Sequence, residues 1–144
     1  METTPNTINR FIIMSVEQYA YSVNKNSGST YATLKNKGII DELVDDYEDM
    51  HGMSTYSINE YISERLGMGL DDLTTSPKDR HVLSKTILIS QVVELIANKY
   101  KISIEEARNR FYESRAIQLL DDDETGLYGE SALYLLSLYE RELN

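Results

Sequence analysis

The sequence contains no cysteine, which excludes disulfide bonds and thiolate metal sites and is typical of a protein from a reducing cytosol. It also lacks a long apolar run. The most apolar stretch, 86–97, is about 12 residues long and contains Ser90, Gln91 and Glu94, whereas a membrane-spanning helix needs roughly 20 apolar residues. Residues 1–5 have neither the basic start nor the apolar core of a signal peptide. We therefore expect a soluble cytoplasmic protein without a membrane segment.

Signals of catalysis are equally scarce. The chain has no glycine-rich phosphate loop, no nucleophile elbow and no paired metal-binding histidines. Its two histidines, His51 and His81, lie in different segments and share no motif. We therefore expect no catalytic residue, no cofactor and no metal ion. An enzyme with a nonstandard site around His51 and the nearby acidic residues is the alternative.

Positive charge is in deficit. The chain has 14 basic and 24 acidic side chains and a formal net charge of −10 over 144 residues. Such a surface repels the phosphate backbone of nucleic acids and favours partners with a basic surface. The same charge also has the simpler role of keeping a protein in solution. We therefore expect a protein partner, no direct binding of nucleic acid and no binding to membranes.

The sequence contains an internal repeat. A shift of 77 residues aligns 12–66 with 89–143 without a gap, and eleven of the 55 aligned positions are identical, against about three expected by chance. Further pairs keep an apolar or aromatic side chain in both copies, among them Tyr19/Ile96, Leu34/Phe111, Met50/Leu127 and Ile58/Leu135. The identical pairs are Ile12/Ile89, Val16/Val93, Glu17/Glu94, Ala20/Ala97, Ile40/Ile117, Leu43/Leu120, Asp45/Asp122, Asp46/Asp123, Gly52/Gly129, Ser54/Ser131 and Leu66/Leu143.

Both copies show the apolar spacing of helices and no sustained alternation typical of strands. Ser103 and Glu106 form a capping box, Ser54 and Ser131 are candidate N-caps, and Gly38 is a candidate left-handed helix stop. The sequence predicts an all-α fold of two tandem four-helix repeats, packed as one compact helical bundle. Repeat one covers 1–66, a linker 67–83 and repeat two 84–144. The expected helices are 6–25, 29–37, 39–47 and 56–66, then helices starting near 85, 103, 116 and 132.

Acidic residues cluster at corresponding places in the two copies. In copy two, residues 121–124 are four consecutive acids, DDDE. They cannot converge on one metal ion, because neighbouring side chains on a helix point about 100° apart, and they lack the ligand spacing of a calcium loop. Solvated helix ends and surfaces that dock a basic partner are the two interpretations. The candidate partner-binding residues are Asp45, Asp46, Tyr47 and His51 in copy one, and Asp121, Asp122, Asp123, Glu124 and Tyr128 in copy two.

Tyrosine dominates the aromatic residues, with 11 Tyr against two Phe and no Trp. Tyrosine suits half-buried positions and binding surfaces, because its ring packs while its hydroxyl stays hydrated. The helical stripe predicts that Tyr19, Tyr56, Tyr61 and Tyr100 belong to the core. Those off the stripe, Tyr21, Tyr31 and Tyr112, are candidates for partner contact, as is Tyr128 in an expected loop.

Two segments carry a resemblance to a known family. Residues 39–62, with the motifs IIDEL, YEDMHG and YSINEYI, resemble a family of small uncharacterised bacterial helical domains. In that family a short helix leads to a Leu-His-Thr-like turn and a final helix ending in Tyr-Ile; here Met50 and Gly52 flank His51 in place of leucine and threonine. Residues 119–134 are similar to a sister group. Members are often encoded beside ADP-ribosyltransferase-like toxins, which implies an antitoxin or an accessory protein of a toxin operon.

The sequence thus predicts a non-enzymatic protein-binding module, an antitoxin or toxin-operon regulator that binds and neutralises a partner toxin. An acidic inhibitor or nucleic-acid mimic that blocks a host defence enzyme, as phages encode, is the alternative function. A homodimer and an internally symmetric monomer are both compatible with tandem copies.

Overall fold

The computed structural model describes residues 4–68 and 81–143, and every regular element in these two ranges is helical. The expected linker, 67–83, falls largely outside the described residues. The elements are α1 (Pro5–Ser22), α2 (Ser27–Asn36), α3 (Ile39–Asp45), α4 (Tyr47–Met50), α5 (Thr55–Arg65), α6 (Val82–Tyr100), α7 (Ile104–Tyr112), α8 (Arg115–Asp121), the 3₁₀ turns η2 (Asp123–Thr125) and η3 (Leu127–Gly129), and α9 (Ala132–Glu142).

Side-chain caps fix the starts of five helices. In each, the side-chain oxygen of the N-cap residue accepts a hydrogen bond from the backbone N–H three residues later, which satisfies one of the free donors of the first turn. Ser103, Ser54 and Ser131 are caps of this kind, as the sequence predicts, and Gly38 adopts the expected left-handed conformation with a φ of 76°. The other two caps are Thr4 and Asn26.

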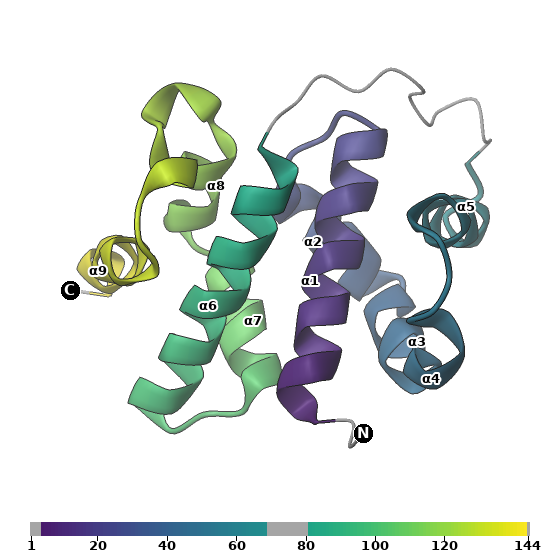
Figure 1. Ribbon diagram of the computed structural model, residues 1–144, viewed down its shortest axis with the longest axis horizontal. Helices are drawn as coiled ribbons and strands as arrows, with labels where there is room; N and C mark the ends of the chain where they lie inside the picture. Colours follow the sequence, from purple (N-terminus) through teal and green to yellow (C-terminus); the bar gives the residue numbers. More distant parts are fainter. Residues whose placement is uncertain (1–3, 69–80, 144) are drawn as a thin grey trace.

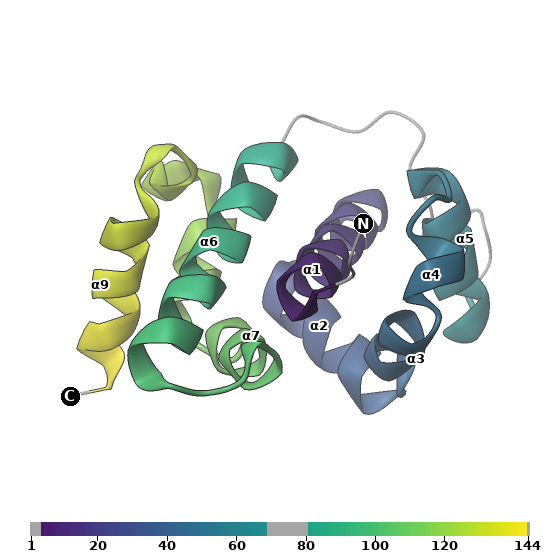
Figure 2. The ribbon, with the colours of Figure 1, turned by 60° about the horizontal axis from the view of Figure 1, so that its bottom comes forward.

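The helices form a central pair with one group on each side (Figure 1). Helices α1 and α6 lie antiparallel and side by side at the centre, and α2 and α7 pack across their far side. Helices α3, α4 and α5 lie along one edge of the molecule, and α8 and α9 lie along the opposite edge (Figure 2). We call residues 39–66 the first edge and residues 116–143 the second edge.

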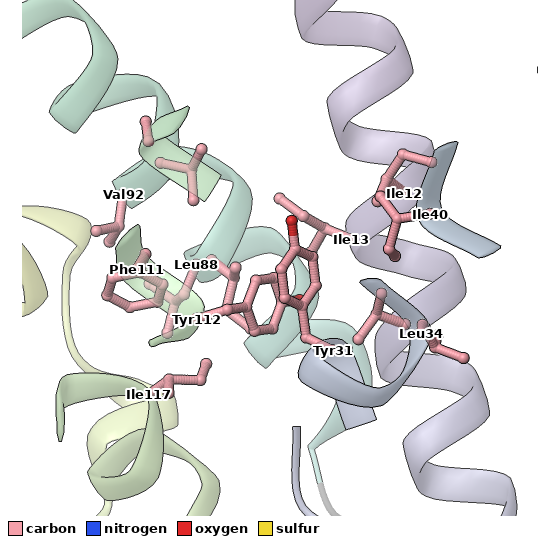
Figure 3. Packing of buried hydrophobic residues seen from close by; sticks show 14 of the residues in the cluster. Ile12, Ile13, Tyr31, Leu34, Ile40, Leu88, Val92, Phe111, Tyr112 and Ile117 are labelled. Carbon is pink, nitrogen blue, oxygen red and sulfur yellow. The ribbon is translucent and has the colours of Figure 1, made fainter. Parts of the chain in front are cut away.

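One hydrophobic core runs through both halves of the chain. Leu43 and Leu120, equivalent under the shift of 77 residues, are both fully buried. Side chains from α1, α2, α6, α7 and α8 meet between the halves (Figure 3). There the rings of Tyr31 and Tyr112 stack with their centroids 4.2 Å apart. The core therefore joins the two halves as well as filling each of them.

The observed elements differ from the predicted ones at some helix ends and in the short turns. Helix α1 ends at Ser22, three residues before its predicted end. Helix α6 begins at Val82, three residues earlier than expected, after His81 in a left-handed conformation with a φ of 59°. The short helix α4 and the 3₁₀ turns η2 and η3 were not predicted, because such turns are set by tertiary contacts and not by a periodic pattern. Among the described helices, none combines the length and apolarity required to cross a bilayer.

Candidate protein-binding surface

Acidic charge is concentrated at the two edges of the molecule. The first edge has eight acidic side chains and one basic side chain, and the second edge has seven and one. The remainder of the chain has nine acidic and twelve basic side chains. The two edges therefore carry net charges of −7 and −6, while the remainder is positive, and the central helices separate them (Figure 2).

At the second edge, two of the expected partner-binding acids make internal contacts. The carboxylate of Asp121 accepts hydrogen bonds from the backbone N–H and the hydroxyl of Ser27, at 3.1 and 3.0 Å. Asp123 forms an ion pair with the buried ammonium of Lys85, whose Nζ lies 2.9 Å from Asp123 Oδ1. Asp122 accepts from the backbone N–H of Glu124 and so caps η2. Most of this run is therefore used to hold the α8–η2 turn against α2 and α6.

Other groups of the second edge are engaged as well. Glu140 binds both Lys99 and the hydroxyl of Tyr100, and these contacts lower the pKa of its carboxyl. Glu142 accepts from the first two backbone N–H groups of α8, at 2.7 and 2.8 Å. The ring of Tyr128 stacks on His81, with centroids 3.6 Å apart. Of the acidic residues expected to bind a partner here, Asp122 and Glu124 are the exposed ones.

The first edge differs in its aspartates. Glu42 is held by Arg65 and by the hydroxyl of Tyr61, and these hydrogen bonds lower the pKa of the Glu42 carboxyl. The four aspartates of this edge are exposed and form no ion pair within the described part of the chain; they are Asp41, Asp45, Asp46 and Asp49. This edge therefore presents negative charge that nothing in the described structure neutralises.

Tyr47 and His51 form a stacked pair below this acidic surface. Tyr47 is buried, and its ring meets Phe11 edge to face at 5.4 Å. The ring of His51 stacks on the other side of Tyr47, with centroids 4.6 Å apart, and its Nδ1 lies 2.9 Å from the carbonyl oxygen of Tyr47. Tyr47 thus belongs to the core, whereas His51 is exposed and lies over it.

Two large apolar side chains are exposed where α5 begins. Met53 is 43% exposed and Tyr56 is 57% exposed. The expectation that Tyr56 lies in the core is wrong, because it occupies the flank of α5 away from the buried Ile58 and Ile62. The first edge thus combines exposed aspartates with exposed apolar side chains.

The other tyrosine expectations need similar corrections. Tyr31 and Tyr112 were expected on the surface, but both are buried, because their helices α2 and α7 face each other across the junction between the halves. Tyr100 was expected in the core but lies at the exposed end of α6. Tyr19 is buried as predicted, with its hydroxyl 3.2 Å from Ser63 Oγ.

Sequence reasoning missed a set of buried polar residues at the junction. Glu17 accepts hydrogen bonds from Ser27 and Tyr112, at 2.7 and 2.9 Å, and burial raises the pKa of its carboxyl to about 7. The buried Arg108 donates to the hydroxyl of Tyr31, at 3.0 Å, and to Oδ1 of Asn9, at 3.1 Å. The other buried members are Lys85 and Ser114. No pattern in the sequence marks this set, since Glu94, the residue equivalent to Glu17, is only partly buried and pairs with Arg10.

No group of three or more histidine or acidic side chains in residues 4–68 and 81–143 has the geometry of a metal site. Comparisons with protein-family models, with curated proteins and with solved structures found nothing that matches this chain.

Proposed function

We propose that this protein is a non-enzymatic protein-binding module of the bacterial cytoplasm, an antitoxin or toxin-operon regulator that binds a basic partner toxin through its first edge. The observation that carries the proposal is the set of exposed, unpaired aspartates on α3 and α4, beside Met53 and Tyr56. Asp45, Asp46 and His51 belong to this surface. Its mechanism is steric: the edge covers a basic cleft of the partner and keeps substrate out.

Physical chemistry favours this edge over the second one. A free carboxylate exchanges hydration and counterions for a partner's lysine or arginine, whereas Asp121 and Asp123 would first have to give up Ser27 and Lys85. The unbalanced charge also accelerates encounter with a basic surface. Met53 and Tyr56 supply the apolar contact that most protein interfaces need at their centre.

A nucleic-acid mimic remains the second candidate function. It requires a continuous ridge of acidic residues, spaced like phosphates along the molecule. The acids of this chain instead lie at two edges, with the more basic helices α1, α2, α6 and α7 between them. This separation favours docking of a protein on one edge.

We also propose that the two halves are tandem copies of one four-helix unit. The starts of the corresponding helices are 77, 77, 76 and 77 residues apart, for α1/α6, α2/α7, α3/α8 and α5/α9. Tyr31 and Arg108, equivalent under the shift of 77, touch each other at 3.0 Å. Direct contact between equivalent residues is expected near a twofold axis that relates two copies. On this view the chain is a monomer built like a dimer.

The proposal is tested with two variants of equal charge change. In the first, Asp45, Asp46 and Asp49 are each replaced by Lys. In the control, Lys replaces three glutamates that are also exposed and form no ion pair within residues 4–68 and 81–143: Glu105, Glu124 and Glu130. Tagged wild-type, variant and control proteins are purified from the native cells, and co-eluting proteins are identified by mass spectrometry.

We expect the wild type and the control to retain one stoichiometric partner with a basic surface, encoded beside this gene, and the first variant to lose it. Co-expression of wild type or control with that partner should relieve its toxicity. A wild type that elutes without a partner would refute the binding role. If both variants lost the partner to the same extent, the first edge would not be the binding site.

A further inference from the structure

A cluster of titratable side chains lies at the junction between the two halves. It contains Glu17 from α1, Ser27 at the start of α2, Tyr112 at the end of α7 and Asp121 at the end of α8. Glu17 is 4% exposed and belongs to the first half, whereas Tyr112 and Asp121 belong to the second. The cluster therefore links the halves through side-chain contacts that depend on protonation.

The hydroxyl of Ser27 cannot serve both carboxyl groups in the same way. Its oxygen lies 2.7 Å from Glu17 Oε1 and 3.0 Å from Asp121 Oδ1, but a serine hydroxyl has one hydrogen to donate. If both carboxyls are ionised, one of these oxygen pairs has no hydrogen between its atoms. If Glu17 is protonated, its O–H donates to Ser27 Oγ, the Ser27 O–H donates to Asp121, and the hydroxyl of Tyr112 donates to the other oxygen of Glu17.

We propose that Glu17 acts as a proton switch at the junction of the two halves. With the proton bound, an unbroken series of hydrogen bonds runs from Tyr112 through Glu17 and Ser27 to Asp121 and holds α1 and α2 against α7 and α8. When the proton leaves, Ser27 satisfies only one of two neighbouring carboxylates, and the contact between α2 and α8 weakens.

The charges around Glu17 are consistent with a proton that leaves near neutral pH. Desolvation, aided by the charge of Asp121, raises the pKa of the Glu17 carboxyl to about 7, against the hydrogen bonds of Ser27 and Tyr112 and the charge of Lys85, which favour the ionised form. Lys85 is already shared with Asp121 and Asp123, at 3.9 and 2.9 Å. Its single charge therefore compensates those aspartates before it can compensate Glu17.

A path for the proton is present. A hollow of about 20 Å³ adjoins Glu17, lined also by Ser27, Lys85 and Asp121, by Tyr21 near the end of α1 and by Lys25 in the connection to α2. This volume accommodates a single water molecule. His81, 3.9 Å from Asp123, is a further titratable group near the cluster.

The test is a comparison of Glu17→Gln with the wild type over pH 5–8. Glutamine copies the protonated side chain, because its amide N–H₂ donates to Ser27 while its carbonyl accepts from Tyr112. Glu94→Gln, at the equivalent position of α6, is the matched control; Glu94 pairs with Arg10 at the surface. Urea unfolding is measured for all three proteins at each pH.

Well below pH 4.5 the carboxyl of Glu17 is protonated in the folded and unfolded states alike, so it does not make the free energy of unfolding depend on pH. Between 4.5 and about 7 the folded state keeps a proton that the unfolded state has lost, so stability falls as pH rises. We therefore expect the folding constant of Glu17→Gln, relative to the wild type, to rise with pH, by about 70-fold from pH 5 to 8. The ratio for Glu94→Gln should not rise.

A second measurement keeps the switch separate from general effects on folding. The Glu17 carboxyl is followed by NMR in the folded wild type, together with hydrogen exchange of the Ser27 amide. We expect the carboxyl to titrate near neutral pH and Ser27 protection to fall over the same range. A Glu17 carboxyl that titrates near 4.5, or a Glu17→Gln ratio independent of pH, would overturn the proposal.

Discussion

At the scale of single residues, the exposure of a side chain depends on its position on the helix relative to the junction between the halves. Tyr31 and Tyr112 are buried because α2 and α7 face each other there, and their hydroxyls find partners in Asn109 and Glu17. Buried tyrosine hydroxyls need such partners. Tyr56 has the same chemistry but lies on the free flank of α5, where its ring is available for binding.

Leu43 and Leu120 provide the test of the core at this scale. Both are fully buried at equivalent positions, so Leu43→Ala and Leu120→Ala should each lower the free energy of unfolding by about 2–5 kcal/mol through lost burial and the cavity left behind. Chemical denaturation measures the loss. Leu133→Ala is the control: Leu133 is 68% exposed, and its replacement should change stability by under about 0.5 kcal/mol. A loss under about 1 kcal/mol at Leu43 or Leu120 would contradict a shared core.

At the scale of elements, the last helix of each half begins in the same way. Ser54 caps α5 and Ser131 caps α9, each accepting a backbone N–H three residues later at 3.1 Å. Ser54→Ala and Ser131→Ala should each cost about 1 kcal/mol of stability, because a donor of the first turn loses its partner. Thermal and urea unfolding provide the comparison.

Ser84→Ala serves as the control for the caps. Ser84 is exposed within α6, and its hydroxyl caps no helix end, so alanine there should be neutral or slightly stabilising. If Ser84→Ala costs as much as the cap substitutions, the caps do not stabilise these helices.

The elements also show how far the sequence predicts this protein. Helix positions followed from the spacing of apolar residues such as Ile12, Val16, Ile89 and Val93, all of them fully buried. The start of α6 could not be predicted in this way, because His81 in a left-handed conformation precedes it and no side chain caps it. Turns η2 and η3 depend on contacts of α8 with the rest of the fold, which a local pattern does not contain.

The candidate site was predictable in composition but not in detail. Both acidic clusters are evident in the sequence, yet only the fold brings Asp121 to Ser27 and Asp123 to Lys85 while leaving Asp45 and Asp46 free. The burial of Glu17 was likewise invisible, since a glutamate on an amphipathic helix is usually solvated. Whether an acidic side chain is paired, buried or exposed depends on tertiary contacts between helices. The contacts of Asp121 with Ser27 and of Glu17 with Tyr112 join residues more than 90 positions apart.

At the scale of the whole molecule, charge and core are arranged in opposite ways. The core is continuous from one half to the other, whereas the acidic residues are divided between two edges on either side of α1 and α6. The junction between the halves contains the proton-sensitive cluster around Glu17, and the first edge carries the free carboxylates. Binding and the internal contact thus occupy different parts of the molecule, and each can be altered without removing the other.

The central claim is that the free aspartates of the first edge bind a basic partner. Its most direct test is the affinity of the co-purified partner, measured by calorimetry at two salt concentrations, for wild type, Asp45→Lys/Asp46→Lys/Asp49→Lys and Glu105→Lys/Glu124→Lys/Glu130→Lys. Interfacial charge pairs lose strength as salt screens them. We predict that wild type and the control variant bind with similar affinity that weakens with salt, while the aspartate variant loses at least about 100-fold. Equal affinity of all three proteins would contradict the claim.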